Sequence, residues 1–559
     1  MQKKYIILSY LIVLVSLFSD ARAQVILKNP ILPGFYPDPA ICKVGTDYYM
    51  VTSTFVYFPG IPVFHSKDLK SWKQITSAIN RPSQMDFMGQ QVSRGLFAPA
   101  INYYKGTFYI TCTNIDHGGN FIITAKNPAG PWSEPIYLKE VRGIDPSLHF
   151  EDDKVFIIYN SDPPEYKSLY SGHRTVKIYE LDLATLKPLG TEKILVNGGV
   201  DISKKPVWIE APHIYKRNGY YYLMAAEGGT SVNHSEVIFR SKEVRGPFIP
   251  YEKNPILTQR HLDPKRKNPI SSVGHADLVE GPDGNTYAVF LGVRPYEGDF
   301  YNTGRETFIA PVKWIADWPV INPDYEQVQY EYKGNWREDK QKNQLPITGN
   351  FSFRVAFKDT LNREFLFLRT HNPSWYNFKE HKNALTIKLL PQTILEKGNP
   401  AFIGRRQQHL SSSGSTEMNF STKLANEKAG IVIFQNENHF YFMCKSYDNG
   451  KDVIQLFKGN PSTDKMDLLK QVVLPSAEKK VYFKVNSERD VYSFWYALKE
   501  NDWKPLADKI DGKYLSTAVA KGFVGVLYGM YATSEGQNTD NTAIYRWFDY
   551  SGNDSTFNR

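Results

Sequence analysis

A weak internal repeat constrains the fold of the first 320 residues more than any other feature of this sequence. Five units each begin with a short motif and continue into an aromatic-rich strand, at spacings of 60, 47, 66 and 64 residues. A unit of four short strands cannot bury both of its faces alone, but several units around one axis can. Five units therefore predict a five-bladed β-propeller, with a β-sandwich built from the same strands as the alternative. The motifs begin at Asp38, Ala98, Asp145, Ala211 and His275, and the strands after them read GTDYYMVTS, GTFYITCTN, DKVFIIYNS, GYYYLMAAE and NTYAVFLGV.

The composition agrees with an all-β chain. Aromatic residues make up 14% of the 559 residues, and 38 Gly with 34 Pro supply many turns. The three cysteines, Cys42, Cys112 and Cys444, are too few and too far apart for a disulfide framework or a thiolate zinc site. The net charge of +9 is scattered along the chain, without a basic block that alternates with aromatic residues. We therefore expect no nucleic-acid partner.

The pattern changes after Trp314. A polar stretch follows, and from Phe351 onward the strands are longer and alternate between apolar and polar residues, as in FSFRVAFKD, ALTIKLL and TAIYRWFDY. This pattern predicts a second domain, a two-sheet sandwich of the lectin-like jelly-roll kind. The expected organisation is a propeller over residues 24–320, a linker over 321–349 and a C-terminal β-sandwich over 350–559.

The N-terminus has the composition of a secretory signal peptide. Lys3 and Lys4 precede an apolar run over residues 5–18, and Ala-Arg-Ala at 21–23 is a small-x-small cleavage site. We expect residues 1–23 to be removed and the mature protein to be exported, either to the periplasm or into the medium. An N-terminal membrane anchor is the alternative, although the run is shorter than the roughly 20 residues that a span needs. No span is expected after removal of the signal.

Three carboxylates lie within or beside the repeat motifs. Asp38 is in GFYPDPAI, Asp145 in RGIDPSLHF and Glu210 in VWIEAPHIY, each flanked by apolar residues and followed closely by Pro. The propeller would bring all three together with His275 near the axis. Burial of a carboxylate is costly unless the group is paired or used, and three at equivalent positions indicate a site rather than turn-forming acids. A protonated acid and an ionised base in an aromatic pocket are the requirements of glycoside hydrolysis, and a third carboxylate raises the pKa of the acid.

The same motifs resemble a known family. The stretch from NPILPGFYPDPAICKVG to FHSKDLKSW, with RGIDPSLHF, WIEAPHIYK, VGHADLV, LGVRP and WPVIN, is similar to glycoside hydrolase family 43, in its two-domain β-xylosidase and α-L-arabinofuranosidase branch. The resemblance implies that Asp38 is the general base that activates water and Glu210 the general acid. Asp145 would orient the acid and tune its pKa. The family is inverting, which fits an acid and a base roughly 6.5–9.5 Å apart.

The resemblance also implies substrate-binding residues. Arg294 in LGVRP matches an arginine that holds sugar hydroxyls, and Phe55 in TSTF matches a pocket wall. Phe97 stands where relatives commonly have Trp, so it keeps a stacking face without the indole N–H. His275 matches a central histidine that in some relatives faces a bound calcium ion or a water, and a satisfied core histidine is its alternative. No cofactor is required, and a structural calcium ion near the axis with His275 stays open.

We therefore expect an exo-acting inverting enzyme that removes terminal non-reducing α-L-arabinofuranosyl residues from plant cell-wall polysaccharide side chains or oligosaccharides. The choice of arabinofuranoside rests on export, and β-D-xylosidase activity is a second or alternative activity. A non-catalytic carbohydrate-binding propeller is the alternative from another class. The motifs GxxxxGK[ST] and HExxH are absent from the sequence, which disfavours nucleotide and zinc-peptidase chemistry. Four aromatic residues of the second domain are candidates to reach the pocket: Phe494, Trp495, Tyr528 and Tyr531. Their strand spacing is more typical of core residues, which is the alternative.

Overall fold

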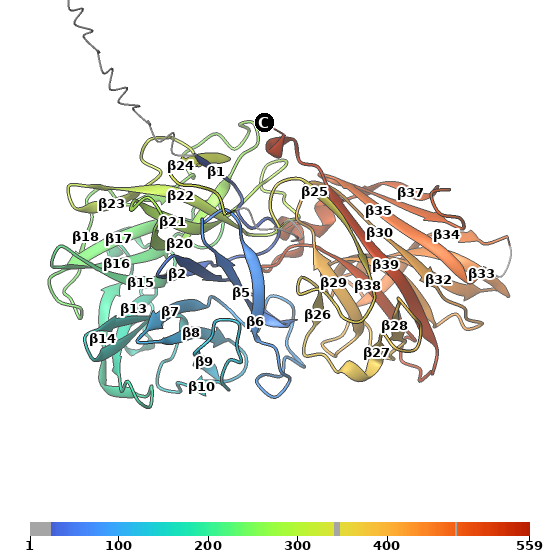
Figure 1. The fold of residues 1–559 in the computed structure, drawn as a ribbon, viewed down its shortest axis with the longest axis horizontal. Helices are drawn as coiled ribbons and strands as arrows, with labels where there is room; N and C mark the ends of the chain where they lie inside the picture. The colour runs from blue at the N-terminus through green and yellow to red at the C-terminus, as the bar shows by residue number, and fades with distance from the viewer. Residues whose placement is uncertain (1–23, 340–346, 476–477, 559) are drawn as a thin grey trace, which may run out of the picture.

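The computed structural model describes residues 24–339, 347–475 and 478–558, so the predicted signal peptide lies outside the described residues. A propeller, coloured from blue through green, lies beside a sandwich, coloured from yellow through orange to red (Figure 1). No helix of the described residues is both long and apolar enough to cross a membrane. The helical elements described are η1 (Pro164–Tyr166), η2 (Ile202–Lys204), η3 (Pro373–Trp375), η4 (Lys513–Leu515), α1 (Thr517–Ala520) and η5 (Ser555–Phe557).

Five antiparallel sheets form the five blades, which confirms the predicted propeller. The first strands of the blades contact one another in a closed ring, β2 to β7, β11, β15, β20 and back to β2. The blades contain, in order, β2 (Ala40–Val44), β3 (Asp47–Val51), β5 (Gly60–Ser66) and β6 (Lys73–Ile79); β7 (Ala100–Tyr104), β8 (Thr107–Asn114), β9 (Gly119–Ala125) and β10 (Ile136–Tyr137); β11 (Ile144–Glu151), β12 (Lys154–Ser161), β13 (Thr175–Leu181) and β14 (Pro188–Asn197); β15 (Ile209–Arg217), β16 (Tyr220–Glu227), β17 (Ser235–Ser241), β18 (Ile249–Pro250) and β19 (Leu257–Thr258); and β20 (Ser271–Glu280), β21 (Thr286–Val293), β22 (Glu306–Ile315) and β23 (Trp318–Ile321).

The repeat motifs share an unusual backbone conformation. Four of the five motifs begin with a residue at positive φ: Asp38 (57°), Asp145 (53°), Ala211 (52°) and His275 (57°). L-residues rarely adopt this left-handed region, and it persists only where the surroundings hold it. In β11, β15 and β20 the pairing register shifts at the same place. The repeat therefore marks a kink at which each innermost strand turns beside the axis.

The ends of the propeller chain meet each other. β1 (Val25–Lys28) pairs with β24 (Glu331–Gly334), so the region expected to be a linker contains a strand. The chain after β1 then runs along β22, where Leu32 bridges to Thr307. The buried side-chain amide of Asn29 donates to the carbonyl of Ile309 at 2.8 Å and accepts from its N–H at 2.9 Å. These contacts close the ring between the first and last blades.

The C-terminal domain consists of two packed antiparallel sheets, as the sequence pattern predicts. One sheet contains β27 (Tyr376–Asn377), β28 (Leu385–Lys388), β39 (Thr542–Gly552), β30 (Ser411–Asn419), β35 (Lys480–Glu488), β36 (Val491–Ala497) and β37 (Lys504–Asp511), with β25 (Phe351–Ala356) on β39. The other sheet contains β34 (Lys465–Val473), β33 (Lys451–Asn460), β32 (His439–Asp448), β31 (Lys428–Asn436), β38 (Leu527–Thr533), β29 (Ala401–Arg406), β26 (Leu366–Leu368) and β4 (Tyr57–Phe58).

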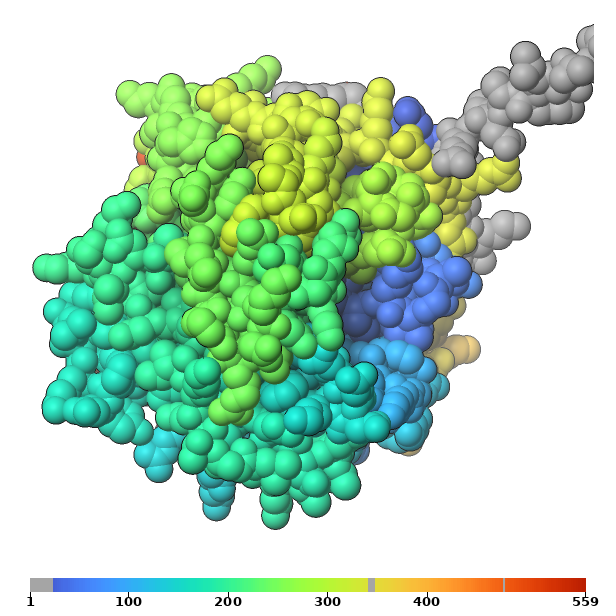
Figure 2. Space-filling model, turned by 90° about the vertical axis from the view of Figure 1, so that its left-hand side faces the viewer, coloured from blue at the N-terminus to red at the C-terminus, as the bar shows by residue number. Residues whose placement is uncertain are grey.

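The two domains share a sheet and a core. β4 belongs to the chain segment of the first blade, yet it pairs with β26 at the edge of the sandwich, where Phe58 lies opposite Phe367. One hydrophobic cluster runs without a break from Phe55 and Ile110 of the propeller to Phe402 of the sandwich. Viewed from the propeller side, the sandwich is almost entirely hidden behind the blades (Figure 2). The sandwich is therefore an integral support of one propeller face.

Candidate active site

The kinked motifs surround a pocket of about 260 Å³ at the propeller axis. It contains six of the seven residues singled out in the sequence; Arg294 is the exception. A larger hollow of about 640 Å³ at the edge of the sandwich has none of the three axis carboxylates in its lining. The smaller pocket is therefore the candidate active site. Its lining consists of Asp38, Phe55, Phe97, Ala98, Ile144, Asp145, Trp208, Glu210, Gly229, Thr230, His275, Arg305 and Phe523.

Asp38 is held in its ionised form. Arg305 Nη1 donates to Asp38 Oδ1 at 3.0 Å, and the Ser53 hydroxyl donates to Oδ2 at 2.6 Å. Burial by itself would raise the pKa of Asp38, but the positive charge of Arg305, together with His275 and the Ser53 hydrogen bond, outweighs it and lowers the pKa below the ordinary value. Asp38 can therefore act as a base, with one oxygen directed by each partner.

Glu210 has the opposite electrostatic character. Burial and the negative charge of Asp38 raise its pKa to about 7. Burial and repulsion by Glu210 and Asp38 also raise the pKa of Asp145 well above its ordinary value. Two carboxylates in one desolvated site cannot both ionise readily, so near neutral pH the site retains a proton on the Asp145 and Glu210 pair. The pocket thus combines an ionised carboxylate with a pair that retains a proton, as an acid and base mechanism needs.

Asp145 is also tied to the strand that carries Glu210. Its Oδ2 accepts a hydrogen bond of 3.3 Å from the N–H of Ala211. Ala211 is the left-handed residue of that motif, so the bond holds the kink directly after Glu210. Asp145 can therefore orient the acid as well as influence its ionisation.

His275 lies beside the base. Its Nδ1 is 3.6 Å from Asp38 Oδ1, and burial lowers its pKa to about 3, so the ring is neutral at ordinary pH. A second histidine, His234, interacts with His275. The His234 ring packs against Gly274, where a Cβ would lie only 2.8 Å from that ring. Among the described residues, no group of three or more His, Cys, Asp or Glu side chains is arranged to hold a metal ion. A calcium ion near the axis stays a prediction.

Three phenylalanines form the apolar wall of the pocket. Phe523 comes from the sandwich and lies 6.1 Å from the ring of Phe55, nearly parallel to it, and 6.0 Å from the ring of Phe97. Its N–H donates to the Ser93 hydroxyl at 2.8 Å, which fastens the sandwich loop to the propeller. The Arg305 guanidinium lies 5.2 Å from the Phe523 ring. The second domain therefore completes the site with an aromatic side chain.

The four aromatic candidates of the second domain do not line the pocket. Phe494, Tyr528 and Tyr531 are buried in the sandwich core, in keeping with their strand spacing. Trp495 lies on β36, with the Lys484 ammonium 5.7 Å from the centre of its ring. Phe523 was missed because it lies in a short loop between α1 and β38, where no periodic pattern indicates its direction.

Arg294 is not in the pocket, which corrects its predicted role in sugar binding. Its side chain is fully buried at the junction of the two domains, where it donates to Glu306, to Asp554 and to the carbonyl of Gln408. Four of its five N–H donors are engaged there, and the side chain does not line the pocket at the axis. Arg305, eleven residues later and directly before β22, is the arginine that faces the pocket. The two arginines flank the same loop, and the sequence does not show which one turns inward.

Comparison with known proteins identifies the family. Residues 27–319 match the model of glycosyl hydrolases family 43, and residues 354–551 match that of the β-xylosidase C-terminal concanavalin A-like domain. The chain therefore belongs to glycoside hydrolase family 43, and it has the two-domain architecture of that family's β-xylosidase branch.

Individual relatives cover nearly the whole chain. A "xylosidase/arabinosidase" of Butyrivibrio fibrisolvens is 39% identical over 530 residues, which are 94% of this chain and 99% of the relative. The "non-reducing end alpha-L-arabinofuranosidase BoGH43B" of Bacteroides ovatus is 36% identical over 547 residues, 97% of this chain and 98% of the relative. Among solved structures, a GH43_12 protein retrieved from a capybara gut metagenome superimposes with a TM-score of 0.85 at 39% identity, covering 91% of this chain and 95% of that one.

Proposed function

We propose that this protein is an exo-acting, inverting glycosidase that removes terminal non-reducing α-L-arabinofuranosyl residues from plant cell-wall glycans, with β-D-xylosidase activity as a second activity. The observation that carries the proposal is the contrast between an ionised Asp38 and a Glu210 with a pKa of about 7 in one pocket. Two carboxylates in opposite protonation states are the requirement for single-step hydrolysis of a glycosidic bond.

In this mechanism Asp38 accepts a proton from the attacking water, while Glu210 donates its proton to the oxygen of the leaving group. The bond from the anomeric carbon to the leaving oxygen breaks as the bond to water forms on the opposite face, which inverts the configuration. Arg305 and Ser53 keep the lone pairs of Asp38 directed. Asp145 holds the turn after Glu210 through Ala211.

The shape of the pocket supports action at chain ends. Phe55, Phe97 and Phe523 wall one side, and the small volume suits one terminal sugar rather than an internal segment of a polymer. Trp208 also lines the pocket, two residues before Glu210, with the Arg174 guanidinium 4.2 Å from its ring. An aromatic ring so near the acid provides a stacking face for the leaving sugar.

The choice of sugar rests on two supports. The predicted signal peptide implies export, where branched fragments still carry arabinofuranosyl side chains, and we propose that the mature protein works in the periplasm or outside the cell. The Bacteroides ovatus relative is named for arabinofuranosidase activity, and the Butyrivibrio fibrisolvens relative for both activities. Terminal arabinofuranose and xylose present similar hydroxyls, so one acid and base pair can serve both.

The test is hydrolysis of an aryl α-L-arabinofuranoside and an aryl β-D-xyloside by the mature protein, side by side, with Asp38→Asn and Glu210→Gln as controls. We expect faster turnover of the arabinofuranoside and loss of turnover of both substrates in Asp38→Asn. Preference for the xyloside would overturn the sugar but keep the mechanism. Binding of sugar without turnover of either substrate would support a non-catalytic carbohydrate-binding propeller instead.

A further inference from the structure

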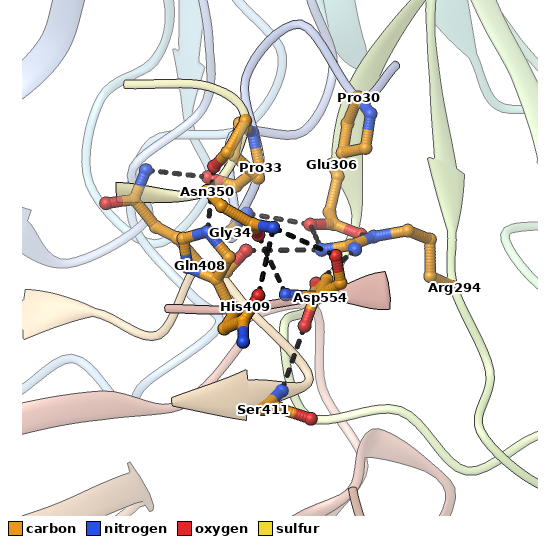
Figure 3. Close-up of polar contacts among 12 residues, drawn as sticks. Pro30, Pro33, Gly34, Arg294, Glu306, Asn350, Gln408, His409, Ser411 and Asp554 are labelled. Atoms are coloured by element: carbon orange, nitrogen blue, oxygen red, sulfur yellow. Dashed lines mark hydrogen bonds and ion pairs between the residues drawn. The ribbon is translucent and has the colours of Figure 1, made fainter. Parts of the chain in front are cut away.

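A buried cluster of charges joins the sandwich to the propeller about Arg294 (Figure 3). Arg294 Nε and Nη2 donate to the two oxygens of Glu306 at 2.7 and 2.9 Å, and Nη1 donates to Asp554 Oδ2 at 2.6 Å. Asp554 belongs to the C-terminal segment, and its Oδ1 accepts from the N–H of Ser411 on the sandwich at 2.9 Å. All three charged side chains are at least 95% buried. Such a cluster fixes its members in one geometry, because moving any one of them leaves a buried charge without its partner.

Glu306 extends this cluster to the chain segment before Asp38. Its Oε1 accepts from the N–H of Gly34 at 2.8 Å. Gly34 has a φ of 86°, and a Cβ there would lie 3.0 Å from the carbonyl of Gln407, so the segment passes close against the sandwich. Gln408 Nε2 donates to the carbonyl of Pro33 at 3.1 Å from the sandwich side. Residues 33–36, which end two residues before Asp38, are thus hydrogen-bonded to both domains.

The neighbour of Glu306 in the sequence is Arg305, which binds Asp38. The carbonyl of Arg305 accepts from the N–H of Tyr36 at 3.1 Å, and the Thr307 hydroxyl donates to the carbonyl of Tyr36 at 2.5 Å. Glu306 therefore lies between two attachments of β22 to the segment that leads to Asp38. Its carboxylate bonds the start of β22, directly after Arg305, to the segment that leads to Asp38.

We propose that Glu306, oriented by Arg294 and Asp554, is a positioning residue that sets the contact between Arg305 and Asp38. This inference rests on the proposed function, because it assigns the cluster a task in the action of the base. The C-terminal tail would then act on the reaction through Asp554, Arg294, Glu306 and Arg305, none of which except Arg305 lines the pocket.

The proposal predicts a change in ionisation as well as in rate. The charged and titratable groups that act on Asp38 are Arg305, His275 and His234, and the carboxylates of Glu210 and Asp145 in the same pocket also interact with it. Burial raises the pKa of Asp38 and Arg305 opposes it most strongly, so a looser contact with Arg305 raises that pKa. A role confined to holding the domains together would change thermal stability without changing the ionisation of the base.

The experiment compares Glu306→Gln and Arg294→Lys with a matched control, Arg369→Lys. Arg369 is another fully buried arginine between the domains, paired with Glu437 and bonded to the carbonyl of Gln90, and none of its hydrogen bonds within the described part of the chain goes to residues 33–38. Each variant is measured for thermal unfolding, for the pH dependence of kcat/KM on the aryl α-L-arabinofuranoside, and for the distance from Arg305 Nη1 to Asp38 Oδ1 in a crystal structure.

We expect all three variants to lower the melting temperature. Glu306→Gln and Arg294→Lys should in addition move the acid limb of kcat/KM upward by about one pH unit and lower kcat by roughly 10- to 100-fold with KM within about threefold, because small misplacements are costly in catalysis. The distance from Arg305 to Asp38 should lengthen beyond 3.5 Å in these two variants alone. The proposal is overturned if the acid limb and this distance stay as in the parent protein while activity falls only with stability, as in Arg369→Lys.

Two further outcomes are distinguishable. If Glu306→Gln does not fold, the measurements on Arg294→Lys test the proposal instead. This variant keeps the positive charge and removes only the paired hydrogen bonds to Glu306, so a raised acid limb and a longer distance from Arg305 to Asp38 would support the positioning role, and unchanged values would overturn it. If the parent protein hydrolyses neither aryl glycoside, the proposed function fails, and the distance from Arg305 to Asp38 in the crystal structures still decides whether Glu306 positions this pair.

Discussion

Asp145 holds the backbone on which Glu210 is mounted, through a bond of 3.3 Å from the Ala211 N–H to its Oδ2. The two carboxylates come from adjacent blades, 65 residues apart in sequence, and the bond crosses the boundary between β11 and β15. The next two boundaries between blades have a similar bond. Between the fourth and fifth blades, Glu236 accepts from the N–H of Ala276 at 3.0 Å. Between the fifth and first blades, Asp277 accepts from the N–H of Ile41 at 2.8 Å. Acidic side chains of one blade thus support the motif of the next.

Replacement of Asp145 can separate its charge from its hydrogen bond. In Asp145→Asn the side-chain oxygen can still accept from Ala211, whereas Asp145→Ala leaves that buried N–H without a partner, at a cost of about 1–3 kcal/mol. We expect the Ala variant to unfold at lower denaturant concentration than the Asn variant, and to have lower kcat on both aryl glycosides. Equal stability of the two variants would show that the bond to Ala211 contributes little.

The role of Glu210 can be tested with leaving groups of different basicity. A dinitrophenolate leaves without a proton, whereas a sugar alkoxide needs one, so Glu210→Gln should lose roughly 10²- to 10⁴-fold in rate on an arabino-oligosaccharide and far less on a dinitrophenyl arabinofuranoside. Asp38→Asn should lose activity on both, because water activation is needed in each case. Equal losses on the two substrates in Glu210→Gln would argue against its role as the acid.

The pH profile of kcat/KM should be bell-shaped. Activity is lost as the pH falls through the lowered pKa of Asp38, because the base becomes protonated, and as the pH rises through about 7, because Glu210 loses its proton. Rates with the dinitrophenyl substrate measured on Glu210→Gln should lack the decline on the alkaline side. A decline that persists in this variant would assign the alkaline limb to another group.

The raised pKa of Glu210 also predicts a penalty in stability. The folded state retains the proton that the unfolded state releases above its own pKa, so the free energy of unfolding falls as the pH rises from about 4.5 to about 7. Glu210→Gln removes this dependence. Chemical denaturation should show the variant gaining about 1–3 kcal/mol relative to the parent protein between pH 5 and pH 7.5. If the free energy of unfolding of the variant and of the parent protein depended on pH in the same way, the pKa of Glu210 would not be raised in the folded state.

Phe523 offers a test of what the sandwich contributes to the pocket. Removal of its ring in Phe523→Ala takes away apolar contact worth about 1.5–3 kcal/mol, so kcat/KM on the aryl arabinofuranoside should fall by roughly 10- to 100-fold. The melting temperature should change little, because the side chain is only partly buried at the edge of the core. The matched control is Val519→Ala in the neighbouring α1, where the side chain is 41% exposed and activity should be unchanged. Similar kinetics for the two variants would exclude a role for the Phe523 ring.

The repeat allowed much of this architecture to be predicted from the sequence. A motif that recurs five times indicates five blades, and carboxylates at or next to equivalent positions in a closed ring converge at its axis. Asp38, Asp145 and Glu210 were found in this way, and so was His275. In the motifs of Asp38, Asp145 and Glu210, the short turn with Pro before an apolar strand also contains the left-handed residue, whereas the motif of His275 has the left-handed residue without a Pro.

The residues that the sequence did not reveal belong to no repeat. Arg305 and Arg294 lie on either side of one loop, and their directions are set by tertiary partners, Asp38 for one and Glu306 with Asp554 for the other. Phe523 reaches the site from a domain whose strands have no periodic relation to the propeller motifs. β4 has two residues within a blade segment, and its partner β26 follows more than 300 residues later. Such long-range pairings leave no local pattern.

The pairing of β4 with β26 limits how such an enzyme can diversify. A catalytic domain joined to its neighbour by a plain tether can be exchanged between chains as a cassette, and each part then evolves at its own pace. Here the first blade donates an edge strand to the adjoining sheet, and the adjoining domain returns an aromatic ring to the pocket. A recombination event between residues 321 and 349 would separate both halves of this exchange at once. Lineages of this architecture should therefore inherit the two domains as a pair, with changes in sugar preference arising by substitution around the pocket rather than by shuffling.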